Sequence, residues 1–303
     1  MGLALGVFLQ VVLPGVGADQ NSQPEPVVDP VMQEYNQILA SDLAFRNSLV
    51  SGLSNKNLDS DSPADRRRIF RQRLQVVEEM YEDFILRYPD HTDVRLDYAS
   101  LLTDFGKEMA ALQHLLKATE LRPDHPDGWN NLANFYGHMG PVKKAFECYG
   151  KAVVLEPKKA VYFENFGTTV FLFRTDAREY FQITEKEVFD KALGLYAKAL
   201  AIEPTNFRLA HDIALTYYGI HDPDRFPAMA RPADALSAWG VALSLASDEK
   251  EKQSVYIHLA RIKTTMGRYD EARGHLADVN LDVHAVLKRR VARTLERVSA
   301  TSD

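Results

Sequence analysis

The chain has 303 residues, of which 46% are hydrophobic and 26% are charged, a composition typical of a folded protein rather than a disordered one. Its formal net charge of −6 argues against a general nucleic-acid binder, whose binding domain would be basic. Cys148 is the single cysteine, so no disulfide forms within the chain and the fold must be stable through its core alone.

The N-terminal segment is apolar and short. Residues 2–16 are almost wholly apolar, and Val16, Gly17 and Ala18 place small or compact residues where a signal peptidase would cut. A membrane-spanning helix needs about 20 apolar residues. We therefore expect a signal peptide over residues 1–18 and export to the periplasm or beyond. A membrane anchor or a misplaced start stays open as an alternative, because no Lys or Arg precedes Arg46.

The next segment, residues 19–62, divides into a linker and a helix. Residues 19–30 are rich in Gln, Pro and acidic residues, which predicts an extended linker. Apolar residues at helical spacing then predict an irregular first helix, and residues 51–61 are typical of a loop. Whether this helix pairs with the one that follows stays open.

Prolines at a fixed spacing of 34 residues divide the middle of the chain: Pro89, Pro123 and Pro157. Such a period indicates a repeat architecture. In the clearest copy, apolar and small residues define one face of each of two helices, with Gly140 and Pro141 at the turn between them. These residues are Trp129, Leu132, Ala133, Tyr136, Ala145, Tyr149 and Ala152. The small side chains allow the two helices to approach closely, and Pro157 ends the pair.

The same register extends in both directions from this copy. One upstream copy matches without a gap, and a more distant one matches in its second helix only. Three downstream copies follow, the first two with insertions between their helices. We count about five repeats plus a degenerate first one over residues 63–279. Residues 280–303 then predict a capping helix and tail with a polar outer face: Lys288, Arg289, Arg290, Arg293 and Arg297.

This pattern resembles the tetratricopeptide repeat (TPR). The resemblance implies an all-α fold, a TPR-type α-solenoid in which antiparallel helix pairs stack into a right-handed superhelix. In TPR proteins the first helix of each pair lines the concave face, and a partner peptide or helix lies along it. The resemblance therefore implies a non-catalytic interaction scaffold that binds a protein or peptide partner.

The polar residues between the core positions of the first helices are the candidate partner-binding residues. They are Asn130, Asn131, Asn134, Glu164, Asn165, Thr168, Arg208, His211 and Asp212. Asparagine offers both a donor and an acceptor, so it can satisfy an extended backbone of any sequence. Asn131 and Asn165 match positions that form an asparagine ladder in some peptide-binding TPR superhelices. The alternative is that asparagine is simply common in such repeats.

A different binding mode of the family is not matched. The carboxylate clamp of co-chaperone TPR domains needs lysines and an arginine on successive first helices. At the matching positions this chain has Leu96, Asn130, Val161 and Asn165. The sequence therefore predicts no binding of an acidic C-terminal tail in that manner.

Two insertions, residues 174–187 and 219–232, fall between the two helices of consecutive repeats, so we expect them on the same edge of the solenoid. Thr184 and Glu187 predict a capping box that restarts the helix. Tyr180, Phe181 and Phe226 are aromatic candidates for partner contacts. The alternative is that these aromatic residues close a local core.

The sequence contains no motif of a zinc protease, a phosphate-binding loop or a nucleophile elbow. We therefore expect no catalytic residue, no cofactor, no metal, no nucleic-acid partner and no membrane span in the mature chain. An alternative is a metal- or ligand-binding accessory domain that uses residues 211–222, where His211, Asp212, His221 and Asp222 lie. Another is a permanent subunit of an envelope or secretion complex. The sequence leaves the partner and the oligomeric state open.

Overall fold

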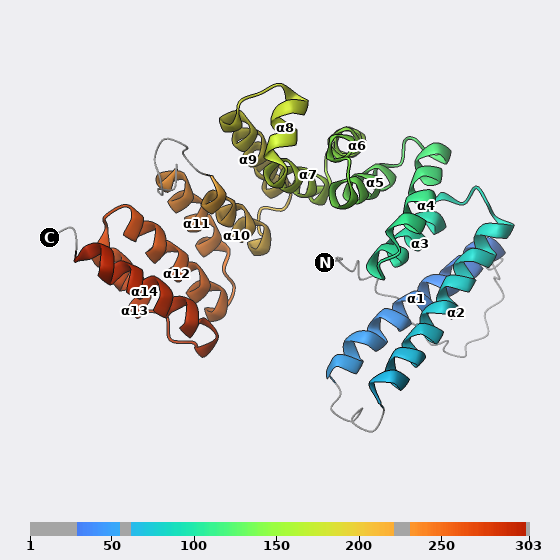
Figure 1. The fold of residues 1–303 in the computed structure, drawn as a ribbon, viewed down its shortest axis with the longest axis horizontal. Coiled ribbons are helices and arrows are strands. Elements are labelled where there is room, and N and C mark those ends of the chain that lie inside the picture. The colour runs from blue at the N-terminus through green and yellow to red at the C-terminus, as the bar shows by residue number, and fades with distance from the viewer. Residues whose placement is uncertain (1–28, 55–61, 221–230, 301–303) are drawn as a thin grey trace, which may run out of the picture. The chain divides into compact units, whose positions relative to one another are not determined.

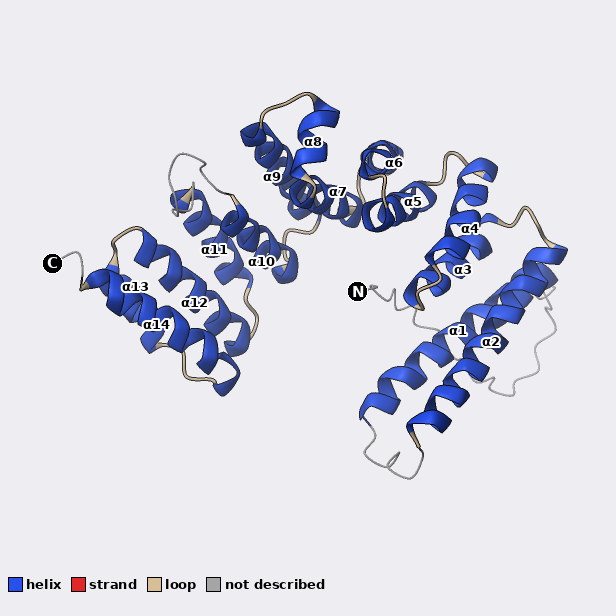
Figure 2. Ribbon diagram, in the orientation of Figure 1, coloured by secondary structure: helices blue, strands red, loops and turns tan. Residues whose placement is uncertain are grey.

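The computed structural model describes residues 29–54, 62–220 and 231–300. In this part of the chain it contains α-helices and short 3-10 turns and no strand (Figures 1 and 2). The predicted signal peptide over residues 1–18 lies outside the described residues, as do His221, Asp222 and Phe226. No helix among the described residues has the length and apolar character needed to cross a membrane. The chain divides into two compact units, Met1–Arg87 and Tyr88–Asp303.

The first unit holds a pair of long helices, α1 (Pro30–Ser54) and α2 (Pro63–Arg87), that contact each other. The Tyr81 hydroxyl on α2 donates to Asp42 on α1 at 2.9 Å, and the rings of Tyr35 and Phe84 lie 6.1 Å apart. This answers the question left open by the sequence, because α1 completes a helix pair with α2. That pair forms a unit of its own, whereas the sequence placed α2 within the solenoid.

Helix α1 differs from the sequence prediction in two ways. It is one continuous helix rather than an irregular one, and it continues to Ser54, into the predicted loop. Serine and glycine are weak helix formers. Only helix nucleation is strongly unfavourable, however, so an existing helix of several turns can extend through such residues at modest cost.

The second unit is built from successive helix pairs, each packed on the next. The pairs are α3 (Thr92–Asp104) with α4 (Glu108–Leu121), α5 (Pro126–Met139) with α6 (Val142–Leu155), α7 (Ala160–Leu172) with α9 (Glu185–Ile202), α10 (Phe207–Thr216) with α11 (Pro232–Leu245), and α12 (Glu249–Thr265) with α13 (Tyr269–Ala277). Between or after them lie α8 (Arg174–Phe181), two 3-10 turns (Tyr217–Gly219 and Asp282–His284) and α14 (Ala285–Ser299). This arrangement confirms the predicted all-α solenoid of helix pairs.

Small residues lie where paired helices meet. The alanines at the repeated positions are buried in every pair of the second unit, with Ala133 on α5 and Ala145 on α6 fully so. At Gly167 on α7 a side chain would meet the Ala192 carbonyl oxygen and the Tyr196 ring of α9, each at 3.2 Å. Close approach of the two backbones therefore requires glycine at this position.

Turns and caps set where the helices begin and end. Gly106, Gly140 and Gly267, each between a first and a second helix, have φ angles of 71–73°, the left-handed region that favours glycine. The capping box of Thr184 and Glu187 at the start of α9 is confirmed. At the other end of the unit, α14 buries Val291 and Leu295 in a core cluster with residues of α12 and α13.

Candidate functional site

The predicted groove residues lie on three consecutive first helices, α5, α7 and α10, which share one register in the repeat. The structure shows that several of them contact one another from one repeat to the next. The contacts divide into an amide chain between α5 and α7 and an ion-pair bridge between α7 and α10.

The amide chain joins three asparagines. Asn165 Nδ2 on α7 donates to Asn130 Oδ1 on α5 at 3.2 Å, and Asn130 Nδ2 donates to Asn131 Oδ1 at 3.2 Å. Asn130 is buried, whereas Asn131 and Asn165 are half-buried. Among the described residues, Asn131 Nδ2 and Asn165 Oδ1 have no partner in this chain of bonds. The chain therefore ends in one unused donor and one unused acceptor.

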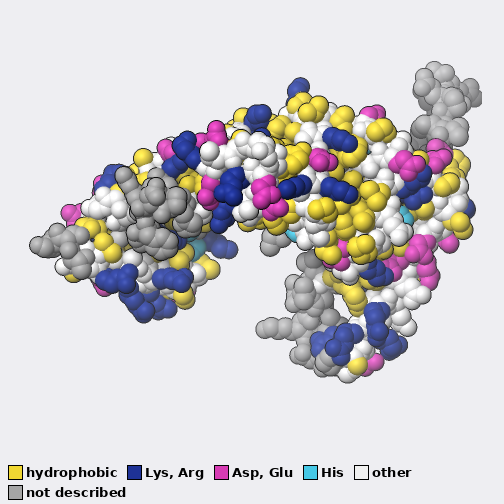
Figure 3. All heavy atoms as spheres, turned by 45° about the horizontal axis from the view of Figure 1, so that its top comes forward, with side chains coloured by type: hydrophobic (Ala, Val, Ile, Leu, Met, Phe, Trp, Pro, Cys, Tyr) yellow, Lys and Arg dark blue, Asp and Glu magenta, His cyan; other side chains and the backbone are white. Residues whose placement is uncertain are grey.

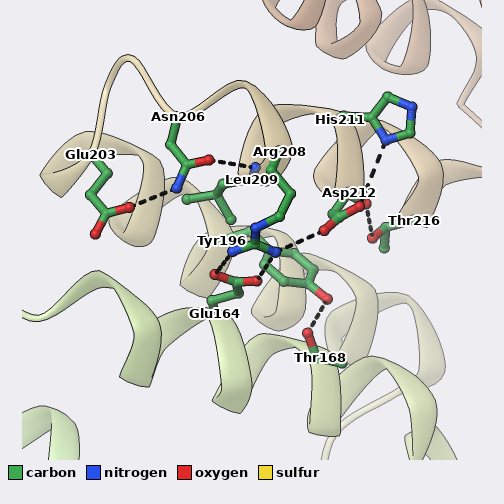
Figure 4. A network of polar contacts seen from close by, with 10 residues as sticks. All are labelled: Glu164, Thr168, Tyr196, Glu203, Asn206, Arg208, Leu209, His211, Asp212 and Thr216. Carbon is green, nitrogen blue, oxygen red and sulfur yellow. Dashed lines mark hydrogen bonds and ion pairs between the residues drawn. The ribbon is translucent and has the colours of Figure 1, made fainter. Parts of the chain in front are cut away.

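The bridge between α7 and α10 is an Arg–Glu pair (Figure 4). The Arg208 guanidinium donates two hydrogen bonds to Glu164, at 2.8 and 2.9 Å, and a third to Asp212 at 3.0 Å. Such two-pronged pairing fixes the relative register of two helices better than a single charge contact does. The hydrogen bonds that Arg208 donates to Glu164 raise the pKa of Arg208, against the smaller effect of burial.

A third contact between first helices was not predicted. Asp127 at the start of α5 accepts hydrogen bonds from Lys159 Nζ, at 2.8 Å, and from the Tyr162 hydroxyl on α7. Burial alone would raise the pKa of Asp127, but these hydrogen bonds lower it below its ordinary value. The sequence did hold a signal for this contact. Asp127 and Arg208 each occupy the second position of a first helix, so a charged residue recurs at the same place in the repeat.

Two of the predicted residues form hydrogen bonds within their own helix pair. Asn134 accepts a hydrogen bond from the Tyr149 hydroxyl of α6 at 2.6 Å, and Thr168 shares one with the Tyr196 hydroxyl of α9 at 2.9 Å. Burial raises the pKa of Tyr149 to about 12, so its hydroxyl is a stable donor at ordinary pH. These contacts connect polar side chains of each first helix to the second helix of the same pair.

The aromatic residues of the first insertion pack inward. Helix α8 contacts α6, and the rings of Tyr180 and Phe181 each lie 5.4 Å from the ring of Phe146. Phe181 also lies 6.4 Å from Phe166. These contacts favour the alternative of a local core for Phe181, while Tyr180 keeps 36% of its surface exposed. Phe226 lies outside the described residues.

His211 belongs to an aromatic cluster that the sequence did not predict. The His211 ring meets the Trp239 ring edge-on, with the ring centres 5.1 Å apart. The His258 ring stacks on the Trp239 ring, with the ring centres 4.2 Å apart and an angle of 5° between the ring planes. The Tyr218 hydroxyl lies 3.1 Å from His258 Nδ1. Burial, helped by His211 and Arg261, lowers the pKa of His258 to about 3, so its imidazole is neutral at ordinary pH.

The metal-binding alternative gains no geometric support within the described ranges. His211 Nδ1 lies 3.7 Å from Asp212 Oδ1, but among these residues no three His, Cys, Asp or Glu side chains are placed to hold a metal ion. His221 and Asp222 lie outside the described residues.

A family model of the tetratricopeptide repeat matches residues 114–146, which run from α4 through α5 into α6. This match confirms the resemblance to the tetratricopeptide repeat over these residues.

Solved TPR structures resemble this TPR protein in fold. The chain is similar to YrrB, "a TPR protein with an unusual peptide-binding site", with 14% sequence identity and a TM-score of 0.52, over 70% of this chain and 97% of that one. It is also similar to pilF of Pseudomonas aeruginosa (20% identity, TM-score 0.48, covering 69% and 87%) and to MamA (18%, 0.45, 64% and 98%). The TPR fold supports a protein-interaction scaffold in general terms.

The single thiol of the TPR protein is part of its packing. Cys148 is buried on α6, and burial raises its pKa to about 11. A thiol with such a pKa is protonated at ordinary pH and is a poor nucleophile.

Proposed function

We propose that the TPR protein holds an extended segment of a partner protein along α5, α7 and α10. The observation that supports this proposal is the amide chain, which ends in an unused donor on Asn131 and an unused acceptor on Asn165. An extended backbone offers one C=O and one N–H per residue, so it complements such a pair without regard to its own sequence.

The remaining polar residues of the groove give the binding surface its rigidity. Asn130, Glu164 and Arg208 are held by contacts between successive first helices, and Asn134 and Thr168 by contacts to second helices. A surface whose polar side chains are already fixed loses little conformational entropy on binding. The proposed groove is thus suited to a partner segment that is flexible before it binds. YrrB, a TPR protein with an unusual peptide-binding site, offers an example of peptide binding on this fold.

Photo-cross-linking tests this proposal directly. A photoreactive residue in place of Asn131 should cross-link a partner in an extract of the native source, whereas one in place of Gln113 should not. Gln113 is an exposed amide side chain on the second helix α4, so it serves as a matched control. Equal cross-linking at both positions would contradict groove binding.

The cross-linked partner then allows a quantitative test. We expect Asn131→Ala with Asn165→Ala to weaken binding about thirtyfold, because two backbone hydrogen bonds of about 1 kcal/mol each are lost. Gln113→Ala should leave the affinity unchanged. Asn131→Ala alone keeps the Asn165–Asn130 bond, so it separates a loss of binding from a loss of fold stability. Unchanged affinity in the double variant would refute the assignment.

A further inference from the structure

A cavity of about 660 Å³ lies between α12 and the closing helix α14. Its apolar part is formed by Ile257 and Val291, which are 0% and 6% exposed, together with Leu287 and Val298. The cavity has room for a large hydrophobic side chain. Neither the sequence nor the family resemblance predicted a site at this place.

The charged residues that line the cavity are all positive. Arg261 of α12 and Arg290 and Arg297 of α14 line it, and no acidic residue does. In the described part of the chain, neither Arg261 nor Arg290 forms an ion pair with a carboxylate. By contrast, Arg208 and Arg231 each contact an acidic residue. Figure 3 shows Lys and Arg side chains gathered over the C-terminal helices.

The side chains next to these arginines contact one another, and these contacts fix their positions. The guanidinium carbon of Arg261 lies 4.0 Å from the centre of the Tyr218 ring, and Tyr218 contacts His258 Nδ1 through its hydroxyl at 3.1 Å. If the tyrosine donates this bond, the neutral His258 carries its proton on Nε2. His258 also lines the cavity, so it adds an uncharged donor to the positive side chains.

The cavity continues the line of the proposed groove. Ile257 and Arg261 occupy, on the first helix α12, the repeat positions that Asn130 and Asn134 occupy on α5. We infer that this cavity binds an acidic segment of the partner protein, with a hydrophobic side chain seated on Leu287 and Val298, above the buried Ile257 and Val291, and neighbouring carboxylates paired with Arg261 and Arg290. The inference rests on the proposed function, because it adds a charged anchor at one end of the same groove. Charge complementarity selects this occupant, since two unpaired guanidinium groups favour carboxylates.

The test uses synthetic peptides and the full chain. The probe is a fluorescein-labelled ten-residue peptide with blocked ends that carries the sequence Asp-Glu-Phe-Glu-Asp at its centre. One comparison peptide has Ala in place of Phe, and another has Lys in place of the acidic residues. We expect the probe to bind at least about tenfold more tightly than either comparison peptide, as measured by fluorescence anisotropy.

A pair of double variants with the same change in net charge locates the site. We expect Arg261→Gln with Arg290→Gln to weaken binding of the probe at least about tenfold, and Arg289→Gln with Arg293→Gln by less than about threefold. Arg289 and Arg293 are exposed on α14 and do not line the cavity. Circular dichroism of all variants checks that each is folded.

Several results would overturn the inference. They are the absence of probe binding to the wild type, an equal loss in both double variants, or equal binding of the Phe and Ala peptides. Displacement of the probe by free dodecanoate together with equal binding of those two peptides would assign the cavity to a free amphiphilic carboxylate instead.

The groove variant distinguishes failure of the inference from failure of the proposed function. Asn131→Ala with Asn165→Ala should leave binding of this short probe unchanged, while it weakens the natural partner. If the arginine variants have no effect and the asparagine variant still weakens the natural partner, the cavity assignment fails and the groove assignment stands. The reverse pattern would retain the cavity and refute the groove.

Discussion

Polar side chains have bonding partners in the middle of the second unit, whereas two arginines at its C-terminal end have no acidic partner among the described residues. Between α5 and α10, first helices are joined to one another by side-chain contacts: Asp127 to Tyr162, Asn130 to Asn165 and Glu164 to Arg208. Between α12 and α14, Arg261 and Arg290 line a cavity without an acidic partner among the described residues.

This difference separates side chains that would shape the proposed groove from those that carry no counter-ion. A polar side chain that is already bonded contributes position and rigidity, and it offers a partner only its remaining lone pairs or protons. A charged side chain without a counter-ion gains more from a partner, because new charge-assisted hydrogen bonds form. The two regions thus suit sequence-independent backbone binding and charge-selective anchoring respectively.

The largest expected effect concerns the two tryptophans, one in the middle region and one on α11, which packs against α12 of the C-terminal region. Trp239 on α11 is fully buried, and Trp129 on α5 is half-buried, with its Nε1 donating to the Pro123 carbonyl at 2.8 Å. We expect Trp239→Ala to cost about 3–5 kcal/mol of stability, and Trp129→Ala less, about 2 kcal/mol. Urea unfolding of the purified chain measures both.

Hydrogen exchange shows where the stability is lost. Because repeat units contact mainly their neighbours, Trp239→Ala should increase exchange most in α10, α11 and α12. Trp129→Ala should act mainly in α4, α5 and α6. Equal loss of protection throughout the second unit for both variants would show that the two regions unfold as one and would remove the basis of the comparison.

The C-terminal region should also be sensitive to acid. The folded-state pKa of His258 is about 3, below the ordinary value near 6.5, so the folded state prefers the neutral imidazole. The stability from this group is present above pH 6.5 and is lost as the pH falls from 6.5 toward 3. The groups that face His258 are His211, Arg261 and Tyr218.

We expect the stability lost by this route to be roughly 1 kcal/mol per pH unit in that range. His258→Phe keeps a ring against Trp239 but cannot take up a proton. Unfolding midpoints between pH 7 and pH 5 should therefore depend less on pH in this variant than in the wild type. An identical pH dependence would mean that other groups cause the acid sensitivity.

The sequence predicted the repeat fold because its signals are local. Ala133, Ala145 and Gly140 are small or turn-forming residues whose positions follow from helix geometry, and the structure places them as expected. The boundary of the solenoid was predicted less well. The pattern of α2 matches a second helix of a repeat, but α2 packs with α1 in a separate unit, and only tertiary contacts decide this.

The bonds between the candidate site residues could not be predicted from the sequence, and their role in binding a partner stays a prediction. The sequence predicted Asn130, Glu164 and Arg208 as residues of one face, since their positions repeat. It did not predict that they bond to one another, because the distance between successive first helices depends on how the repeats stack. The cavity near Arg261 was missed for a related reason, since α14 carries no repeat register that would place Arg290 opposite α12.

A smaller effect distinguishes the two ends of the amide chain. Asn165→Ala removes the donor to Asn130, a buried side chain, whereas Asn131→Ala removes only the last acceptor. We expect a loss of about 1–2 kcal/mol for Asn165→Ala and less than about 1 kcal/mol for Asn131→Ala. Thermal unfolding monitored by circular dichroism measures the order. The opposite order would show that the contact between α5 and α7 does not carry the stability assigned to it.

The smallest expected effect concerns the Arg208–Glu164 bridge. Half of the Arg208 side chain is exposed, at 50%, so water and salt screen the pair even though Glu164 is 17% exposed. A double-mutant cycle with Arg208→Gln and Glu164→Gln should give a coupling energy of about 0.5–1 kcal/mol that decreases with added salt. The same cycle for Arg208 and Asp212, which share one helix and a single bond at 3.0 Å, should give a smaller value. If both cycles gave equal coupling, the pairing between repeats would add nothing beyond what neighbours on one helix provide, and the rigidity ascribed to the middle region would have to come from its apolar contacts alone.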